Sequence, residues 1–162
     1  DAGLRALKFH ADWRWAAIFG ALLAGWSQAS GAAPISLLVP MPLHAARRAE
    51  RGFNQAAQIA RFAAIWLGVT VDQRILIRAR PTRPQTTLSA ARRRDNVHGA
   101  FELHPDAWLR AGESSVIALI DDVRTTGATL DAASTALQSL PRVSIQRWAV
   151  ASTMPTNTMR PA

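Results

Sequence analysis

Apolar and polar residues follow a helical pattern at the start of the chain. Apolar side chains recur there every three or four positions, at Leu4, Leu7, Ala11, Trp15, Ile18 and Leu22. This spacing predicts an N-terminal helical segment over residues 1–30. A second interpretation stays open, because Arg5 and Lys8 precede the apolar run Ala16–Trp26 as they would in a secretion signal. That run is shorter than the roughly 20 apolar residues of a membrane span, so no span is expected.

Strand and helix patterns alternate through the rest of the chain. Short apolar runs predict strands at Ile35–Val39, Arg74–Arg78, Val97–Leu103, Val116–Ile120 and Val143–Ala151. Helical patterns lie at Asn54–Leu67 and Thr126–Leu140. This alternation predicts an α/β fold with an open, mostly parallel sheet flanked by helices. We expect one domain over residues 1–154 and a disordered tail at 155–162.

The composition narrows the chemistry without choosing a function. Hydrophobic residues make up 49% of the chain, so it is not a disordered protein. Cysteine is absent, which excludes disulfides and thiolate metal sites and fits a reducing, cytoplasmic location. The net charge is +8, mostly from arginine, and favours anionic partners from diphosphates to nucleic acid. The six tryptophans are expected in the core rather than on a base-stacking surface.

Two acidic residues and a loop of small residues follow the most apolar strand. Asp121 and Asp122 come directly after Val116–Ile120, and hydroxyl donors follow at Thr125, Thr126 and Thr129. Gly127 permits a positive φ, and the free N–H groups of the next helix favour a phosphate. The carboxylates would instead accept hydrogen bonds from a vicinal diol. A ribose 5-phosphate satisfies both halves, whereas an ordinary turn with one capping Asp explains only part of the pattern.

Basic residues follow the first predicted strand, at Arg47, Arg48 and Arg51. In an open α/β sheet, ligands bind beyond the carboxyl ends of the strands, so this junction and the acidic one should share an edge. Its arginines could meet a diphosphate, and Asn54 could cap the following helix. The segment Arg80–Asn96 contains prolines and many charges and predicts a long mobile loop. Its arginines either contact a ligand or form a solvated face.

Three motifs resemble known families. The segment Ile120–Thr129 resembles the signature of type I phosphoribosyltransferases that binds 5-phosphoribosyl 1-diphosphate (PRPP), although Arg124 stands where that signature is usually apolar. Val39–His44 together with Arg51–Gln55 resembles the ComF family of competence-associated proteins. Further matches to that family are Leu7-Lys8-Phe9, Gln85, Leu88, Arg93, Asn96, Val97, Gly99, Ala100 and Phe101. The resemblance runs from about Leu4 to Ser152 and lacks the four-cysteine zinc module with which many members begin.

The resemblance implies a site for PRPP and Mg²⁺, and transfer of the phosphoribosyl group to a nitrogen nucleophile with release of pyrophosphate. It implies that Asp121 and Asp122 bind the ribose diol and that Arg93 closes over the diphosphate from its loop. The residues implied to hold the 5-phosphate are Val123, Thr125, Thr126, Gly127, Ala128 and Thr129. Those implied around the diphosphate are Pro42, Leu43 and Arg51. Mg²⁺ would be held mainly by the ligand and water rather than by side chains directly.

A binding module is the alternative to an enzyme. The ComF resemblance implies a role in DNA uptake, so the fold could sense PRPP without turnover while a basic surface holds single-stranded DNA. No recognisable nucleic-acid motif supports this alternative. Salt-dependent DNA binding without PRPP turnover would favour it. The resemblance also leaves room for an oligomer or a partner in the competence machinery.

Overall fold

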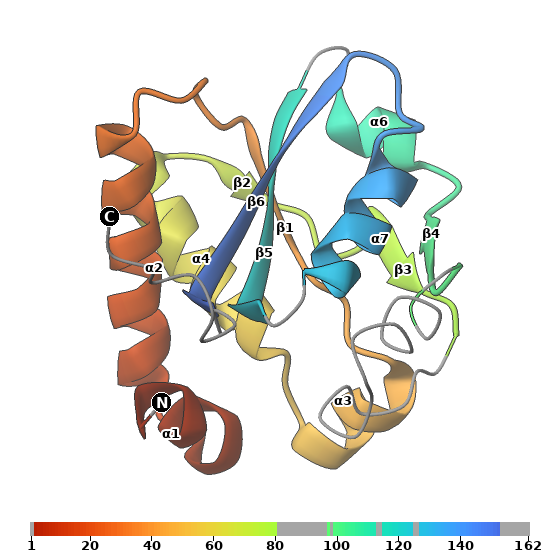
Figure 1. Cartoon of the computed structure of the whole chain (residues 1–162). Helices are drawn as coiled ribbons and strands as arrows, with labels where there is room; N and C mark the ends of the chain where they lie inside the picture. The colour runs from red at the N-terminus through yellow and green to blue at the C-terminus, as the bar shows by residue number, and fades with distance from the viewer. Residues whose placement is uncertain (1, 81–96, 98, 113–114, 125–126, 153–162) are drawn as a thin grey trace, which may run out of the picture.

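The chain folds around a parallel sheet of four strands (Figure 1). Its structure is a computed structural model, which describes residues 2–80, 97, 99–112, 115–124 and 127–152. The strand order is β2-β1-β5-β6, with bounds β1 Leu37–Pro40, β2 Thr70–Val71, β5 Ser115–Arg124 and β6 Val143–Ser152. Two short antiparallel strands form a second sheet, β3 Leu76–Arg78 and β4 Phe101–Leu103. The prediction of an open, mostly parallel sheet flanked by helices is confirmed.

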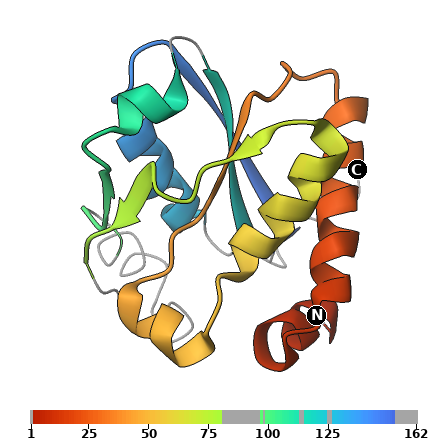
Figure 2. The same cartoon turned by 180° about the vertical axis from the view of Figure 1, so that it is seen from behind.

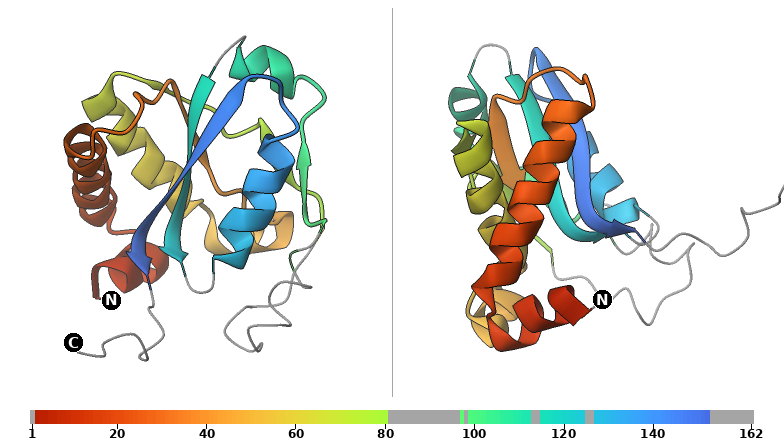
Figure 3. Two further views of the ribbon diagram at one scale, coloured as in Figure 1. Left: turned by 45° about the horizontal axis from the view of Figure 1, so that its top comes forward. Right: turned by 90° about the vertical axis from the view of Figure 1, so that its left-hand side faces the viewer.

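Helices cover both faces of the four-stranded sheet (Figure 3). Their bounds are α1 Ala2–His10, α2 Trp13–Ala29, α3 Ala45–Arg51, α4 Gln55–Leu67, α6 Ala107–Ala111 and α7 Ala128–Leu137. One core cluster joins α1, α2 and α4 to the sheet, and another joins α6, α7 and the β3–β4 pair to its other face. The short helix α3 lies with α1 at one end of the sheet (Figure 2).

Strand β5 is buried on both faces, as the sequence predicts for a central parallel strand. Its side chains alternate between the two clusters, because successive residues of a strand point to opposite faces. Ile117 and Leu119 belong to the cluster beneath α7, whereas Ala118 and Ile120 belong to the cluster beneath α2 and α4. This alternation decides which layer each of the next residues will face.

The N-terminal segment is two helices rather than one continuous helix. Ala11 adopts a positive φ of 48°, and Asp12 then caps α2 by accepting a hydrogen bond from the Arg14 N–H at 3.2 Å. The corner is tightly packed, because a Cβ on Gly3 would collide with the Trp15 ring. The turn places α1 at the end of the sheet towards which β5 and β6 point (Figure 1).

Other boundaries also differ from the prediction. Strand β5 does not stop at Ile120 but continues to Arg124, because β6 pairs with it along that length. Helix α7 consequently begins at Ala128 rather than Thr126. Helix α3 falls in a segment for which no helix was predicted. The predicted mobile loop, apart from Arg80, and the predicted tail lie outside the described residues.

The expectation that the tryptophans form core is wrong for most of them. Trp148 is buried, but four others are 42–64% exposed: Trp13, Trp26, Trp66 and Trp108. These four lie on helices whose inward faces are filled by smaller residues such as Ala16 and Ala60. The core is therefore built from alanine and branched aliphatic side chains more than from rings.

Helices α2 and α4 are in backbone contact at Gly20. A Cβ added there would lie 2.6 Å from the Phe62 Cβ and 2.7 Å from the Ala63 nitrogen. We expect Gly20→Ala to lower the free energy of unfolding by about 1–3 kcal/mol, because the helices must separate. Gly25 lies in the same helix with nothing within 4 Å of a Cβ. Gly25→Ala should instead raise that free energy by about 0.5–1 kcal/mol. Urea unfolding measures both, and equal effects would contradict the close contact.

Candidate functional site

The two sequence junctions meet at one edge of the sheet. Strands β1 and β5 run in parallel register with Pro40 opposite Ile120, and the Met41 N–H donates to the Ile120 carbonyl at 2.8 Å. Pro42 and Leu43 therefore follow β1 at the edge where the acidic pair of β5 lies. The prediction that the β1 junction and the acidic junction lie at one edge of the sheet is confirmed.

The two acids lie within β5 rather than after it. Asp121 continues the side of Ile117 and Leu119, which faces α7 and β3, and Asp122 continues the opposite side, which faces α1 and α4. Asp122 is only 6% exposed. The two residues are nevertheless linked, because the Asp122 N–H donates to the Asp121 Oδ1 at 2.9 Å. Asp122 is therefore buried and Asp121 half-buried, and each faces a different layer of the fold.

Asp122 is held by two helices that are remote in sequence. The Lys8 ammonium of α1 forms an ion pair with its carboxylate, and the Gln55 Nε2 of α4 donates to it at 3.3 Å. The Arg51 guanidinium donates in turn to the Gln55 Oε1 at 2.8 Å. The Val123 N–H completes the set at 2.9 Å. A chain of contacts thus links Arg51, a predicted diphosphate residue, to the acidic pair.

The surroundings shift the pKa values of Asp121 and Asp122 in opposite directions. Burial, with the charge and hydrogen bond of Asp122, raises the pKa of Asp121 to about 8. Burial also acts to raise the pKa of Asp122, but the charge and hydrogen bond of Lys8, together with Asp121 and Gln55, hold it below its usual value. At neutral pH these shifts favour the protonated form of Asp121 and the ionised form of Asp122. Such a pair offers both a donor and a strong acceptor.

Basic side chains lie near the acidic pair on both faces of the sheet. The charge of Asp121 acts on Arg78 of β3, whose guanidinium lies 5.5 Å from the centre of the Phe101 ring. Burial and the charge of Arg47 lower the pKa of Arg78, which Asp121 partly offsets. Lys8 and Arg51 stand on the Asp122 side. Positive groups around a buried diol acceptor suit an anionic sugar ligand.

The start of α7 forms the other half of the site. Gly127 precedes the helix with a φ of 82°, so the expected positive φ is present. A Cβ there would lie 3.2 Å from the Arg124 Nε, so the loop is close to the strand end. A small pocket between them is lined by Asp121, Val123, Arg124, Gly127, Thr129 and Leu130. Helix N–H groups beside this pocket favour a phosphate. Thr125, Thr126 and Arg93 lie outside the described residues.

Asn54 has the capping role that the sequence suggested. Its Oδ1 accepts from the N–H groups of Ala56 and Ala57 at 3.0 and 3.4 Å. Its Nδ2 also donates to the Met41 carbonyl at 2.9 Å. The cap therefore ties α4, and with it Gln55, to the end of β1.

Three residues of the site were not predicted for it: Lys8, Gln55 and Arg78. Lys8 carried two signals, since it lies in the Leu7-Lys8-Phe9 match to the ComF family and is the single lysine of a chain whose other cationic side chains are arginines. Gln55 ends the Arg51–Gln55 motif that resembles the ComF family, but no role was assigned to it, and Arg78 carried no signal, because only tertiary contacts bring them to the acids. In the described part of the chain, no three His, Asp or Glu side chains converge to bind a metal.

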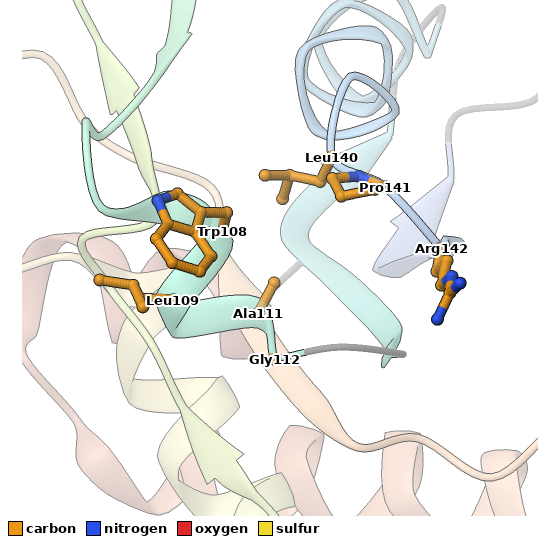
Figure 4. A pocket seen from close by; sticks show the side chains of 7 residues that line it. All are labelled: Trp108, Leu109, Ala111, Gly112, Leu140, Pro141 and Arg142. Atoms are coloured by element: carbon orange, nitrogen blue, oxygen red, sulfur yellow. The ribbon is translucent and has the colours of Figure 1, made fainter.

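A larger hollow of about 560 Å³ lies away from these residues (Figure 4). It is lined by Trp108, Leu109, Ala111, Gly112, Leu140, Pro141 and Arg142. It lies near the amino ends of β5 and β6, where Ser115 pairs with Val143. The smaller pocket is the better candidate for an anionic sugar, because Asp121, Arg124 and the start of α7 line it.

Solved structures of phosphoribosyltransferases share this fold. An adenine phosphoribosyltransferase aligns with a TM-score of 0.57 at 15% identity, covering 93% of this chain and 75% of that protein. The glutamine PRPP amidotransferase from B. subtilis aligns with a TM-score of 0.53 at 18% identity, covering 83% of this chain and 26% of that one. The chain therefore has the type I phosphoribosyltransferase fold.

Proteins of similar sequence show to which family of this fold the chain belongs. Competence protein F of Haemophilus influenzae is 36% identical over 118 residues, which is 70% of this chain and 49% of that protein. DNA utilization protein YhgH of Salmonella typhi is 33% identical over 118 residues, which is 72% of this chain and 49% of that protein. The same protein of Escherichia coli K12 is 31% identical over 117 residues, with equal coverage. The chain belongs to this ComF family and spans about half the length of these relatives. No family model matches it.

The sequence led to the expectation that the chain has no membrane span. Among the helices that the structure describes, none has the length and apolar character needed to cross a bilayer.

Proposed function

We propose that this domain binds PRPP with Mg²⁺ and transfers its phosphoribosyl group to a nitrogen nucleophile. The observation that supports it most is the convergence of Asp121, Asp122 and the start of α7 with the Pro42–Arg51 segment at one edge of the sheet. A diol acceptor, a phosphate-binding helix start and a cationic segment are the three elements that PRPP requires. The competence-related names of the relatives supply the proposed context, DNA uptake.

Each group of the site has a role in this proposal. Asp122 and Asp121 hydrogen-bond the ribose hydroxyls, and the first N–H groups of α7 bind the 5-phosphate. Arg51 and the backbone at Pro42 and Leu43 hold the diphosphate. Mg²⁺ would be held mainly by the ligand and water and would neutralise charge on the leaving group.

The reaction needs no nucleophile from the protein. The bond from C1 to the diphosphate oxygen breaks as the bond from nitrogen to C1 forms, and the electron pair leaves with pyrophosphate. The proton of the incoming amine passes to water. Catalysis would come from holding the ribose in position and from stabilising charge on the departing diphosphate.

A PRPP sensor that binds single-stranded DNA is the second candidate. The supporting observation is helix α3, which carries Arg47, Arg48 and Arg51 at the same edge as the acidic pair. A cationic helix beside the ligand site would attract a phosphate backbone, with a salt slope of about 0.7 per neutralised phosphate.

One set of measurements separates these candidates. We expect calorimetry to show PRPP–Mg²⁺ binding with a dissociation constant of about 1 μM to 1 mM. A panel of amines, bases and nucleic acids in a pyrophosphate-release assay then tests turnover. Binding without release, together with DNA binding that PRPP displaces in fluorescence anisotropy at fixed ionic strength, favours the sensor. No binding of PRPP contradicts both candidates.

A further inference from the structure

The Lys8 side chain is partly buried against Asp122 instead of extending into water as most surface lysines do. It projects from α1, a nine-residue helix whose Leu4 and Leu7 are buried in the core. Its side chain is 23% exposed and forms an ion pair with the carboxylate of Asp122, whose side chain is 9% exposed. Bringing a long cationic side chain out of water has a cost in solvation and in side-chain entropy. The packing of α1 by its leucines does not require that contact.

We propose that Lys8 is a positioning residue of the ribose site, which keeps the Asp122 carboxylate ionised and aimed at the ribose diol. This inference rests on the proposed PRPP site and extends it, since it makes the N-terminal helix one wall of that site. Lys8 would act through Asp122 rather than on the reacting atoms.

The position of Lys8 is fixed by packing around the α1–α2 corner. Gly3 lies so close to the Trp15 ring that no Cβ would fit. The Trp13 ring contacts the Phe53 ring edge to face, with centroids 4.8 Å apart. Phe53 immediately precedes the Asn54 cap and Gln55. The start of α2, against which α1 packs through Gly3 and Trp15, thus contacts the segment that carries Gln55, the other side-chain donor to Asp122.

The charges around the pair explain why this lysine matters. Asp122 faces Lys8 from α1, Gln55 from α4 with Arg51 behind it, and Asp121 on its own strand. Arg78 lies on the other side, where the charges of Asp121 and Arg47 both act on it. Lys8 is therefore the cation in direct contact with Asp122 in the described structure. A buried carboxylate that loses its cation takes up a proton instead. A doubly protonated pair would accept hydrogen bonds from the ribose poorly.

The test is the pH dependence of PRPP binding in matched variants. Calorimetry with PRPP and Mg²⁺ between about pH 6 and pH 9 compares the wild type with Lys8→Met, Lys8→Arg and Arg5→Met. Lys8→Met should bind about tenfold more weakly at neutral pH, with the pH midpoint of binding moved upwards. Lys8→Arg should restore most of the affinity. Arg5 is exposed on the same helix, so Arg5→Met removes an equal charge and should leave the midpoint unchanged.

The outcomes distinguish this inference from the proposed function. Binding by Lys8→Met with the wild-type affinity and pH midpoint overturns the role of Lys8 alone. A wild type that binds no PRPP overturns the proposed function and the role of Lys8 with it. Circular dichroism checks that each variant folds, and Lys8→Gln replaces Lys8→Met if the latter does not.

Discussion

Replacing Asp121 and Asp122 together should abolish PRPP binding while the fold survives. Asparagine keeps the shape of each side chain but cannot supply an ionised acceptor to the ribose hydroxyls. Hydrogen bonds to a charged group contribute about 1.5–3 kcal/mol each, so we expect affinity to fall at least about 100-fold. Alanine at both positions should have the same effect on binding. The Lys8 side chain is partly exposed and can turn to water when its partner is neutral.

Calorimetry with PRPP and Mg²⁺ on the Asp121→Asn, Asp122→Asn double variant measures this loss. Asp106 provides a matched control, because it is exposed and lies in the segment before α6, outside the predicted site residues. Asp106→Asn should leave the affinity within about twofold of the wild type. Unchanged affinity in the double variant would remove both acids from the site, whereas a loss of fold shown by circular dichroism would assign them a structural role.

The pH dependence of stability should change when Asp121 alone becomes asparagine. The folded pKa of Asp121 is about 8, above the ordinary value of 3.8, so between these pH values the folded state holds a proton that the unfolded state has lost. Its contribution therefore favours folding at low pH and is lost as the pH rises through 8. Asp121→Asn removes this term, because its side chain does not titrate.

Urea unfolding at about pH 5.5 and about pH 8.5 measures the difference. Relative to the wild type, Asp121→Asn should gain about 1–3 kcal/mol of unfolding free energy on going from the lower to the higher pH. The Asp106→Asn variant serves as the control and should follow the wild-type curve. Parallel curves for Asp121→Asn and the wild type would show that Asp121 titrates normally in the folded protein.

The sequence by itself determined the strand, the acids and the helix start, because these are neighbours in the chain. An apolar run with no polar face predicted a buried central strand, and β5 is that strand. Gly127 indicated a positive φ and Asn54 a helix cap, and both are present, since each depends on the local backbone. Parallel pairing then placed the β1 and β5 junctions at one edge, as the α/β pattern predicts.

Only the tertiary structure decided what surrounds the acidic pair. The corner at Ala11 turned α1 across the strand ends and brought Lys8 to Asp122, and the antiparallel β3–β4 pair brought Arg78 towards Asp121. No local pattern encodes these contacts, because they depend on how separate elements pack. Strand β5 also ran past its predicted end, since its length depends on pairing with β6. The separation of the two carboxyl pKa values follows from this packing, because burial and neighbouring charge are properties of the folded chain.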